Sequence, residues 1–182
     1  MENLTFYKKY YSLEDYLFNE VNSNFKKNHF LTKEEFFAII TWKSNRSKTK
    51  IAKEMERKEI IVEKLTTDLF NTKDSKKQVE ILTSIKEIGI PIASAILSVC
   101  FSEKFTIFDY RVVEAINMVK KRKVIQYPID KNKTQMYLDY VRVCSEIAKD
   151  NKISLREADK CLWGVSFYEG KDGLKELIQS IK

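Results

Sequence analysis

Glycine and proline are scarce in this chain, with 4 glycines and 2 prolines among 182 residues. Sheets need many tight turns, and such turns favour these two residue types. The scarcity therefore argues against a sheet-rich fold. Lys, Glu, Leu and Ile are abundant instead, which suits helices, and a hydrophobic fraction of 43% is enough to bury a core. We predict an all-α, multi-helix fold and a single helical domain over 1–182.

Histidine occurs once and cysteine three times. A lone His29 argues against a His-based catalytic triad or metal site, and we expect it in an exposed loop. Cys100, Cys144 and Cys161 stand in apolar helical patterns without a CxxC spacing, so we interpret them as buried thiols of a reducing compartment. The sequence also lacks a Walker-type glycine loop and an HExxH motif. We predict no metal and no cofactor.

Long apolar runs are absent as well. No segment approaches the roughly 20 residues of a membrane span, and charges from Lys8 onward interrupt any signal-peptide pattern. We therefore expect a cytoplasmic protein with no membrane partner. We also expect a monomer, although the sequence leaves the oligomeric state open.

Basic residues exceed acidic ones by 33 to 26, which gives a formal net charge of +7. Much of the excess lies in two runs, at 43–58 and 120–133. An excess of this size favours a polyanionic partner. The alternative is that both runs are simply solvated faces.

Apolar side chains recur at helical spacing along most of the chain. Ser12 marks a helix start, and Thr32 with Glu35 forms a capping-box pattern. Asp109 is expected to cap a later helix. We predict helices or helix-like stretches at about 12–27, from 32, at 43–69, 75–87, 91–101, 109–121, 134–149 and 154–164, and from 173.

The most informative stretch is Ile88-Gly89-Ile90-Pro91. Glycine after a helix supplies the left-handed position that ends it, and proline suits the first turn of the next helix. The pattern predicts a tight helical hairpin. Backbone N–H groups of Ile88, Gly89 and Ile90, at a helix N-terminus, are suited to bind a DNA phosphate. An ordinary structural hairpin is the alternative.

The stretch 85–97, followed by 105–112, resembles the helix–hairpin–helix (HhH-GPD) DNA glycosylase superfamily. Segments 42–46 and 159–163 also resemble small prokaryotic members, including 8-oxoguanine glycosylase-like ones. The resemblance implies a helix–hairpin–helix core at about 75–120 and two helical lobes around a cleft. It further implies double-stranded DNA with a damaged base as the partner, and Asp109 as the catalytic carboxylate. The alternative for Asp109 is a plain helix cap.

Departures from the family pattern refine this expectation. The Lys that gives some members lyase activity is replaced here by Pro91, which cannot form a Schiff base. We therefore predict a monofunctional DNA N-glycosylase that hydrolyses the N-glycosidic bond. Glu87 and Lys86 replace the family's first hairpin Gly and its Pro. An acidic side chain beside a phosphate is unfavourable, so the alternative is a degenerate member, a non-catalytic DNA-binding module. Three cysteines also cannot supply the four-cysteine iron–sulfur cluster that some members carry.

Supporting roles fall to residues near these motifs. Trp42 and Trp163 are candidates to stack on an extruded base, although Trp163, which follows Leu162, is favoured as a core residue. Asp159 either pairs with a basic residue or contacts a base. The candidates for phosphate binding are Lys43, Arg46 and Arg111, and the alternative for Arg46 is an ion pair with a carboxylate. Besides a glycosylase and a non-catalytic DNA-binding module, a third possibility for the whole protein is a helical interaction protein whose charged side chains only interact with solvent.

Overall fold

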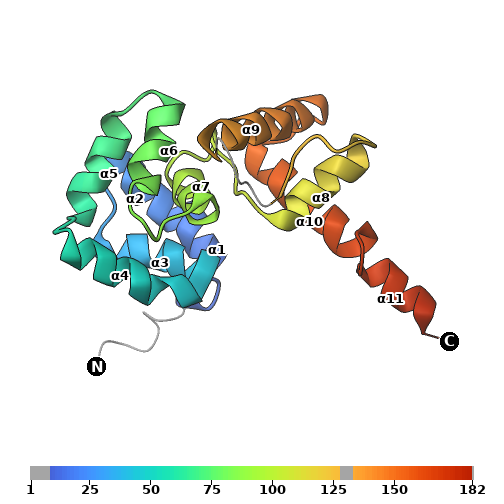
Figure 1. The fold of residues 1–182 in the computed structure, drawn as a ribbon, viewed down its shortest axis with the longest axis horizontal. Helices are drawn as coiled ribbons and strands as arrows, with labels where there is room; N and C mark the ends of the chain where they lie inside the picture. Colours follow the sequence, from blue (N-terminus) through green and yellow to red (C-terminus); the bar gives the residue numbers. More distant parts are fainter. Residues whose placement is uncertain (1–8, 128–132, 182) are drawn as a thin grey trace. The chain divides into compact units, whose positions relative to one another are not determined.

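A computed structural model describes residues 9–127 and 133–181 of the chain. Within these residues every regular element is a helix and none is a strand, which confirms the all-α fold class (Figure 1). In chain order the elements are α1 (Leu13–Asp15), the π-helix η2 (Tyr16–Val21), α2 (Asn22–Asn28), α3 (Lys33–Ser44), the 3-10 helix η3 (Asn45–Ser47), α4 (Lys48–Arg57), α5 (Val62–Asn71), α6 (Ser75–Thr83), α7 (Ile90–Cys100), α8 (Tyr110–Val119), α9 (Lys133–Asp150), α10 (Leu155–Glu169) and α11 (Leu174–Ser180).

The chain divides into two compact units, Met1–Ser102 and Glu103–Lys182. The boundary falls between the two stretches that carry the family resemblance, 85–97 and 105–112. The hairpin at 88–91 therefore belongs to the first unit and Asp109 to the second. Lys131, part of the second basic run, lies outside the described residues.

The first unit is built around α7, which contacts α2, α3 and α6 (Figure 1). Small side chains on α7 are fully or almost fully buried and let the neighbouring helices approach closely, as their size predicts. They are Ala93, Ser94, Ala95 and Ser98. The buried side-chain amide of Asn22 donates to the Val99 carbonyl oxygen at 2.6 Å and ties α2 to α7.

Local capping signals are confirmed by the structure. The Thr32 hydroxyl accepts from the Glu35 backbone N–H at 3.2 Å, and the Glu35 carboxylate accepts from the Thr32 backbone N–H at 2.9 Å. The same reciprocal pair forms between Ser154 and Glu157 at the start of α10. Each box satisfies two backbone donors that a helix start leaves without intrahelical partners.

The predicted helix-like stretch over 43–69 is not continuous. Glu59 adopts a left-handed conformation with φ of 52°. The Ile60 backbone N–H then donates back to the Met55 carbonyl oxygen at 2.8 Å, which closes the end of α4. This is the hydrogen-bond pattern that usually places glycine at the left-handed position. Because glutamate occupies it here, the break carries no sequence signal.

Gly89 also differs from its prediction. Its φ of −84° and ψ of 174° are extended rather than left-handed, and it caps the start of α7 instead of ending α6. The link 84–89 is longer than a tight hairpin requires because its apolar side chains Ile85 and Ile88 are 1% exposed and pack into the core. Pro91 lies in the first turn of α7, as predicted.

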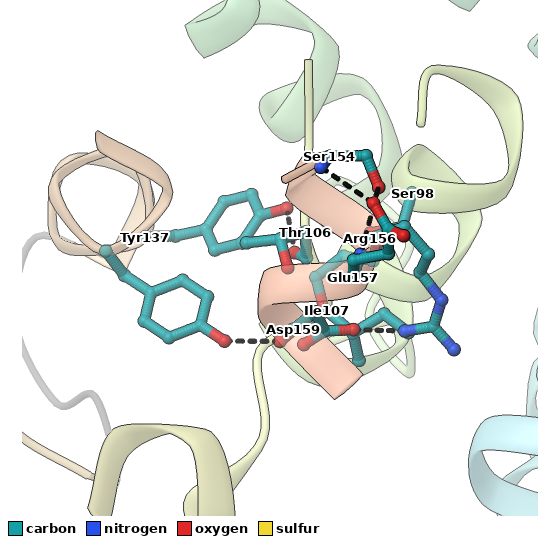
Figure 2. A network of polar contacts seen from close by, with 10 residues as sticks. Ser98, Thr106, Ile107, Tyr137, Ser154, Arg156, Glu157 and Asp159 are labelled. Carbon is teal, nitrogen blue, oxygen red and sulfur yellow. Dashed lines mark hydrogen bonds and ion pairs between the residues drawn. The ribbon is translucent and has the colours of Figure 1, made fainter. Parts of the chain in front are cut away.

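The second unit contains the irregular segment 105–109, which is hydrogen-bonded to α9. The Tyr137 hydroxyl donates to the Thr106 carbonyl oxygen at 2.8 Å (Figure 2). The Tyr140 hydroxyl donates to the Ile107 carbonyl oxygen at 2.5 Å. Burial raises the pKa of both tyrosines well above the usual range, so the hydroxyls remain protonated donors. Backbone carbonyls outside a helix are thereby satisfied in the core.

The cysteines do not share one environment. Cys100 and Cys144 are buried as predicted, and burial raises the pKa of both thiols. Cys161 is exposed on α10, which contradicts the prediction of a buried thiol. Because the thiolate is the reactive form, we expect iodoacetamide to modify Cys161 first in the folded protein. Peptide mass spectrometry over time should show this order, and Cys161→Ser should remove the fast phase. Equal labelling of the three thiols would contradict it.

Candidate nucleic-acid interface

Asp109 begins α8. Its extended backbone, with φ of −136° and ψ of 143°, is that of an N-cap, and its Oδ1 accepts from the Arg111 backbone N–H at 3.1 Å. The predicted capping role is thus confirmed. The side chain is half-buried, so the carboxylate lies at the molecular surface and at the positive end of a helix dipole.

The residues after Asp109 join a cluster of aromatic rings. The Arg111 guanidinium carbon lies 5.2 Å from the ring centre of Tyr110, 5.4 Å from that of Trp163 and 5.7 Å from that of Phe167. Trp163 and Phe167 stack on each other, with ring centres 5.4 Å apart and planes 10° apart. We call these four residues the Arg111 cluster. It joins the start of α8 to α10, which contact each other.

The rings of the Arg111 cluster are exposed. Tyr110 is 51% exposed, Trp163 43% and Phe167 44%. The interpretation of Trp163 as a core residue is therefore wrong, and its neighbour Leu162, 3% exposed, is the core residue. Successive residues of a helix point about 100° apart, so adjacent positions can face the core and the surface. Exposed aromatic rings beside a cation are able to stack on nucleic-acid bases.

Asp159, one turn before Trp163 on α10, is 4% exposed and pairs with Arg156 (Figure 2). Of the two roles that the sequence allows it, the structure shows the ion pair. The pair satisfies a buried charge that would otherwise be costly. The low exposure of Asp159 makes it a poor candidate for contact with a base.

Other candidates lie in the first unit. Trp42 is half-buried in α3, and its ring packs edge-to-face against Phe18 with centres 5.8 Å apart. Lys43 is half-buried and Arg46 is exposed. Arg46 is thus well placed to meet an anion, whereas Trp42 is less exposed than Trp163.

The hairpin presents little side-chain surface. Ile88 is 1% exposed and Ile90 5%, whereas Gly89 is exposed. A Cβ atom added at Gly89 would meet only Pro91 Cδ within 4 Å, at 3.8 Å. Packing therefore does not require glycine there. The Ile88 backbone N–H already donates to the Ile85 carbonyl oxygen at 2.8 Å, which contradicts its predicted role in phosphate binding. Any contact to phosphate would be made by the backbone of Gly89 and Ile90.

A polar brace behind the Arg111 cluster was not identified from the sequence. The Glu114 carboxylate accepts from the Ser166 hydroxyl and from the Lys171 backbone N–H, the latter at 3.2 Å. Gly170 makes room for it, because a Cβ atom there would lie 2.4 Å from Glu114 Oε2. The brace holds α8 against the end of α10 and so keeps Arg111 beside its rings.

Phe167 and Tyr110 were also missed. The only sequence signals for them were the spacing of four between Trp163 and Phe167 and the position of Tyr110 directly after Asp109. These signals do not show that α8 and α10 lie against each other, which is what assembles the cluster.

Comparisons with known proteins found no matching family model, curated protein or solved structure. In the described part of the chain, no helix has both the length and the apolar character needed to cross a bilayer. Over the same residues, no group of three or more His, Cys, Asp or Glu side chains is placed to hold a metal ion.

Proposed function

We propose that this protein is a monofunctional DNA N-glycosylase that uses Asp109 as its catalytic carboxylate. The observation that carries the proposal is the position of Asp109. It is a half-buried carboxylate at the start of α8, directly before the exposed rings and the cation of the Arg111 cluster. An acid beside a surface suited to stacking is what removal of an extruded base needs.

The chemistry follows from the charge of the carboxylate. As the C1′–N bond breaks, its electron pair leaves with the base and positive charge builds on the sugar. Asp109 stabilises that charge and accepts a proton from the water whose oxygen forms the new bond to C1′. The proton is then passed to the departing base. Water and the base–sugar bond are consumed, and a free base and an abasic sugar are formed.

Base extrusion would draw on the Arg111 cluster. Unstacking a base costs a few kcal/mol and is easiest for a damaged or mismatched one. Stacking on an aromatic ring returns roughly 1–3 kcal/mol per base. Trp163 and Phe167 supply the rings, and Arg111 supplies a cation for a flanking phosphate. In the first unit, the exposed Arg46 and the backbone around Gly89 are separate candidates for sequence-independent phosphate contacts.

The direct test is incubation with a panel of duplexes, each with one damaged base. We expect release of a free base from at least one lesion. Because Pro91 occupies the lyase position, strand breaks should appear only after alkali. Breaks without alkali would show that an amine of the protein forms a Schiff base and would contradict the monofunctional assignment.

A non-catalytic DNA-binding module is the second candidate. Two observations favour it: Asp109 already serves as a helix cap, and Glu87 places a half-buried acid two residues before Gly89. An acid beside a phosphate weakens binding. DNA binding without base release from any lesion would support this candidate.

Both candidates require salt-dependent DNA binding. A triple charge reversal of exposed residues in the first basic run, Arg46→Glu, Lys48→Glu and Lys50→Glu, should weaken duplex binding and flatten its salt dependence, by about one unit of slope per lost phosphate contact. Anisotropy titrations at several salt concentrations measure this effect. The matched control is reversal of the exposed Lys26, Lys27 and Lys149, which lie outside both basic runs. If the two triple variants weaken binding equally, the basic residues of the first run only interact with solvent and do not contact DNA specifically.

A further inference from the structure

The second unit contains an open groove of about 590 Å³ along α8. Its volume is in the range of small-ligand sites, which is about 300–1,000 Å³. Apolar side chains of Val113, Met118 and Ile125 form part of its lining. Tyr110, which belongs to the Arg111 cluster, also lines it. An occupant of the groove would therefore reach the residue next to Asp109.

The far wall of the groove is held in place by Asn117. Its side-chain oxygen accepts from the backbone N–H groups of Val124 and Ile125, at 2.7 and 3.1 Å. Its side-chain nitrogen donates to the Ile125 carbonyl oxygen at 2.9 Å. A single amide thus fixes the returning segment at Val124 and Ile125 against α8.

Two tyrosines stand at the rim. Tyr110 is 51% exposed and Tyr127 is 44% exposed, and their ring centres are 6.3 Å apart. Tyr127 stacks on the buried Phe108, with centres 5.4 Å apart and planes 25° apart. The core side chain orients the Tyr127 ring, while much of that ring remains open to an incoming planar group.

The charge of the groove is positive. Lys121, Arg122 and Lys123 line it and are all exposed. The acidic residue in the lining is Glu114, and its carboxylate is engaged by the Ser166 hydroxyl and the Lys171 N–H. Oriented rings beside consecutive cations suit a ligand that carries both a planar base and a phosphate.

We infer that this groove binds an unpaired segment of single-stranded DNA, with a base stacked on Tyr127 or Tyr110 and phosphates at Lys121–Lys123. The inference rests on the proposed function for the choice of DNA as the polymer. It adds a preference for DNA that is locally unpaired, since bases inside a duplex cannot offer their faces to the rings. An anionic membrane surface is the competing occupant because it would satisfy the cations without needing the rings.

The test compares the affinities of the protein for two fluorescently labelled oligonucleotides of about 12 nucleotides, measured by fluorescence anisotropy. One is oligo(dT) and the other has the same phosphates but abasic sugars throughout. We expect the wild-type protein to bind oligo(dT) at least about tenfold more tightly, in line with stacking of one or two bases. Tyr127→Ala should remove most of that difference, and Tyr127→Phe should keep it. The control is Tyr11→Ala, which alters a tyrosine that is 97% exposed in the first unit.

A second set of variants separates charge from stacking. Lys121→Glu with Lys123→Glu should weaken both oligonucleotides alike. If Tyr127→Ala fails to fold, Tyr127→Leu supplies the same test, because leucine keeps an apolar side chain against Phe108 but offers no ring for stacking. Equal binding of the two oligonucleotides by wild type would overturn the inference, as would tighter binding to phosphatidylserine vesicles than to oligo(dT).

Failure of this inference can be told apart from failure of the proposed function. Base release from a lesion duplex without a preference for oligo(dT) would contradict DNA binding in the groove but support the glycosylase proposal. A preference for oligo(dT) that depends on Tyr127, without base release from any lesion, would support DNA binding in the groove and contradict the glycosylase proposal.

Discussion

Asp109→Asn should reduce base excision by roughly 10²–10⁴-fold, the range typical for loss of a general acid or base. Asparagine keeps the size of the side chain but not its charge. The developing positive sugar would lose its counter-charge, and the attacking water would lose its proton acceptor. Single-turnover release of the damaged base, measured by mass spectrometry, gives the rate.

The same substitution should leave folding and DNA affinity nearly intact. Asparagine is as good a helix cap as aspartate, and the Asp109 interaction with the Arg111 N–H can be made by its side-chain oxygen. The matched control is Asp74→Asn, because Asp74 caps α6 in the same way, accepting from the Lys77 N–H at 2.9 Å. An Asp109→Asn protein that unfolds, while Asp74→Asn does not, would support a capping role alone.

Trp163→Ala should weaken binding of a lesion duplex by about 5-fold to 150-fold, which corresponds to roughly 1–3 kcal/mol of base stacking. The substitution also removes the ring that lies 5.4 Å from the Arg111 guanidinium carbon and the face on which Phe167 stacks. Trp163→Phe should retain most of the affinity because a ring remains. Titration of duplexes with and without a lesion measures the effect, which should be confined to the lesion duplex.

Tyr168→Ala is the matched control for Trp163. Tyr168 lies on the same helix and is 46% exposed, similar to Trp163 at 43%. Its loss should change affinity little. If Tyr168→Ala weakens binding as much as Trp163→Ala does, the Arg111 cluster is not the surface that receives the base.

Short-range signals account for most of what the sequence predicts correctly. Thr32 with Glu35, Pro91 and Asp109 each act within one helical turn, so their neighbours along the chain decide their roles. The break after α4 was not predictable by the same means, because a glutamate takes the left-handed position that usually belongs to glycine.

The candidate site was also predictable from the sequence only in part. The position of Asp109 follows from its sequence context alone. The Arg111 cluster depends on α8 packing against α10 and on the Glu114 brace, which spans 52 residues to Ser166. Pairings of that range leave no periodic trace in one sequence. The exposure of Trp163 was missed for the same reason, since an aromatic residue beside a core leucine favours burial unless the neighbouring helix is known.

Binding of a cationic abasic analogue tests the role of Asp109 most directly, because it does not depend on knowing which base is excised. A duplex with a pyrrolidine in place of the sugar at one position mimics the positive charge of the transition state, and a tetrahydrofuran of the same shape is neutral. The wild-type protein should bind the cationic duplex at least about 100-fold more tightly, as expected for a transition-state mimic. Asp109→Asn should bind the two duplexes alike. Equal binding of both duplexes by the wild-type protein would contradict a catalytic role for Asp109.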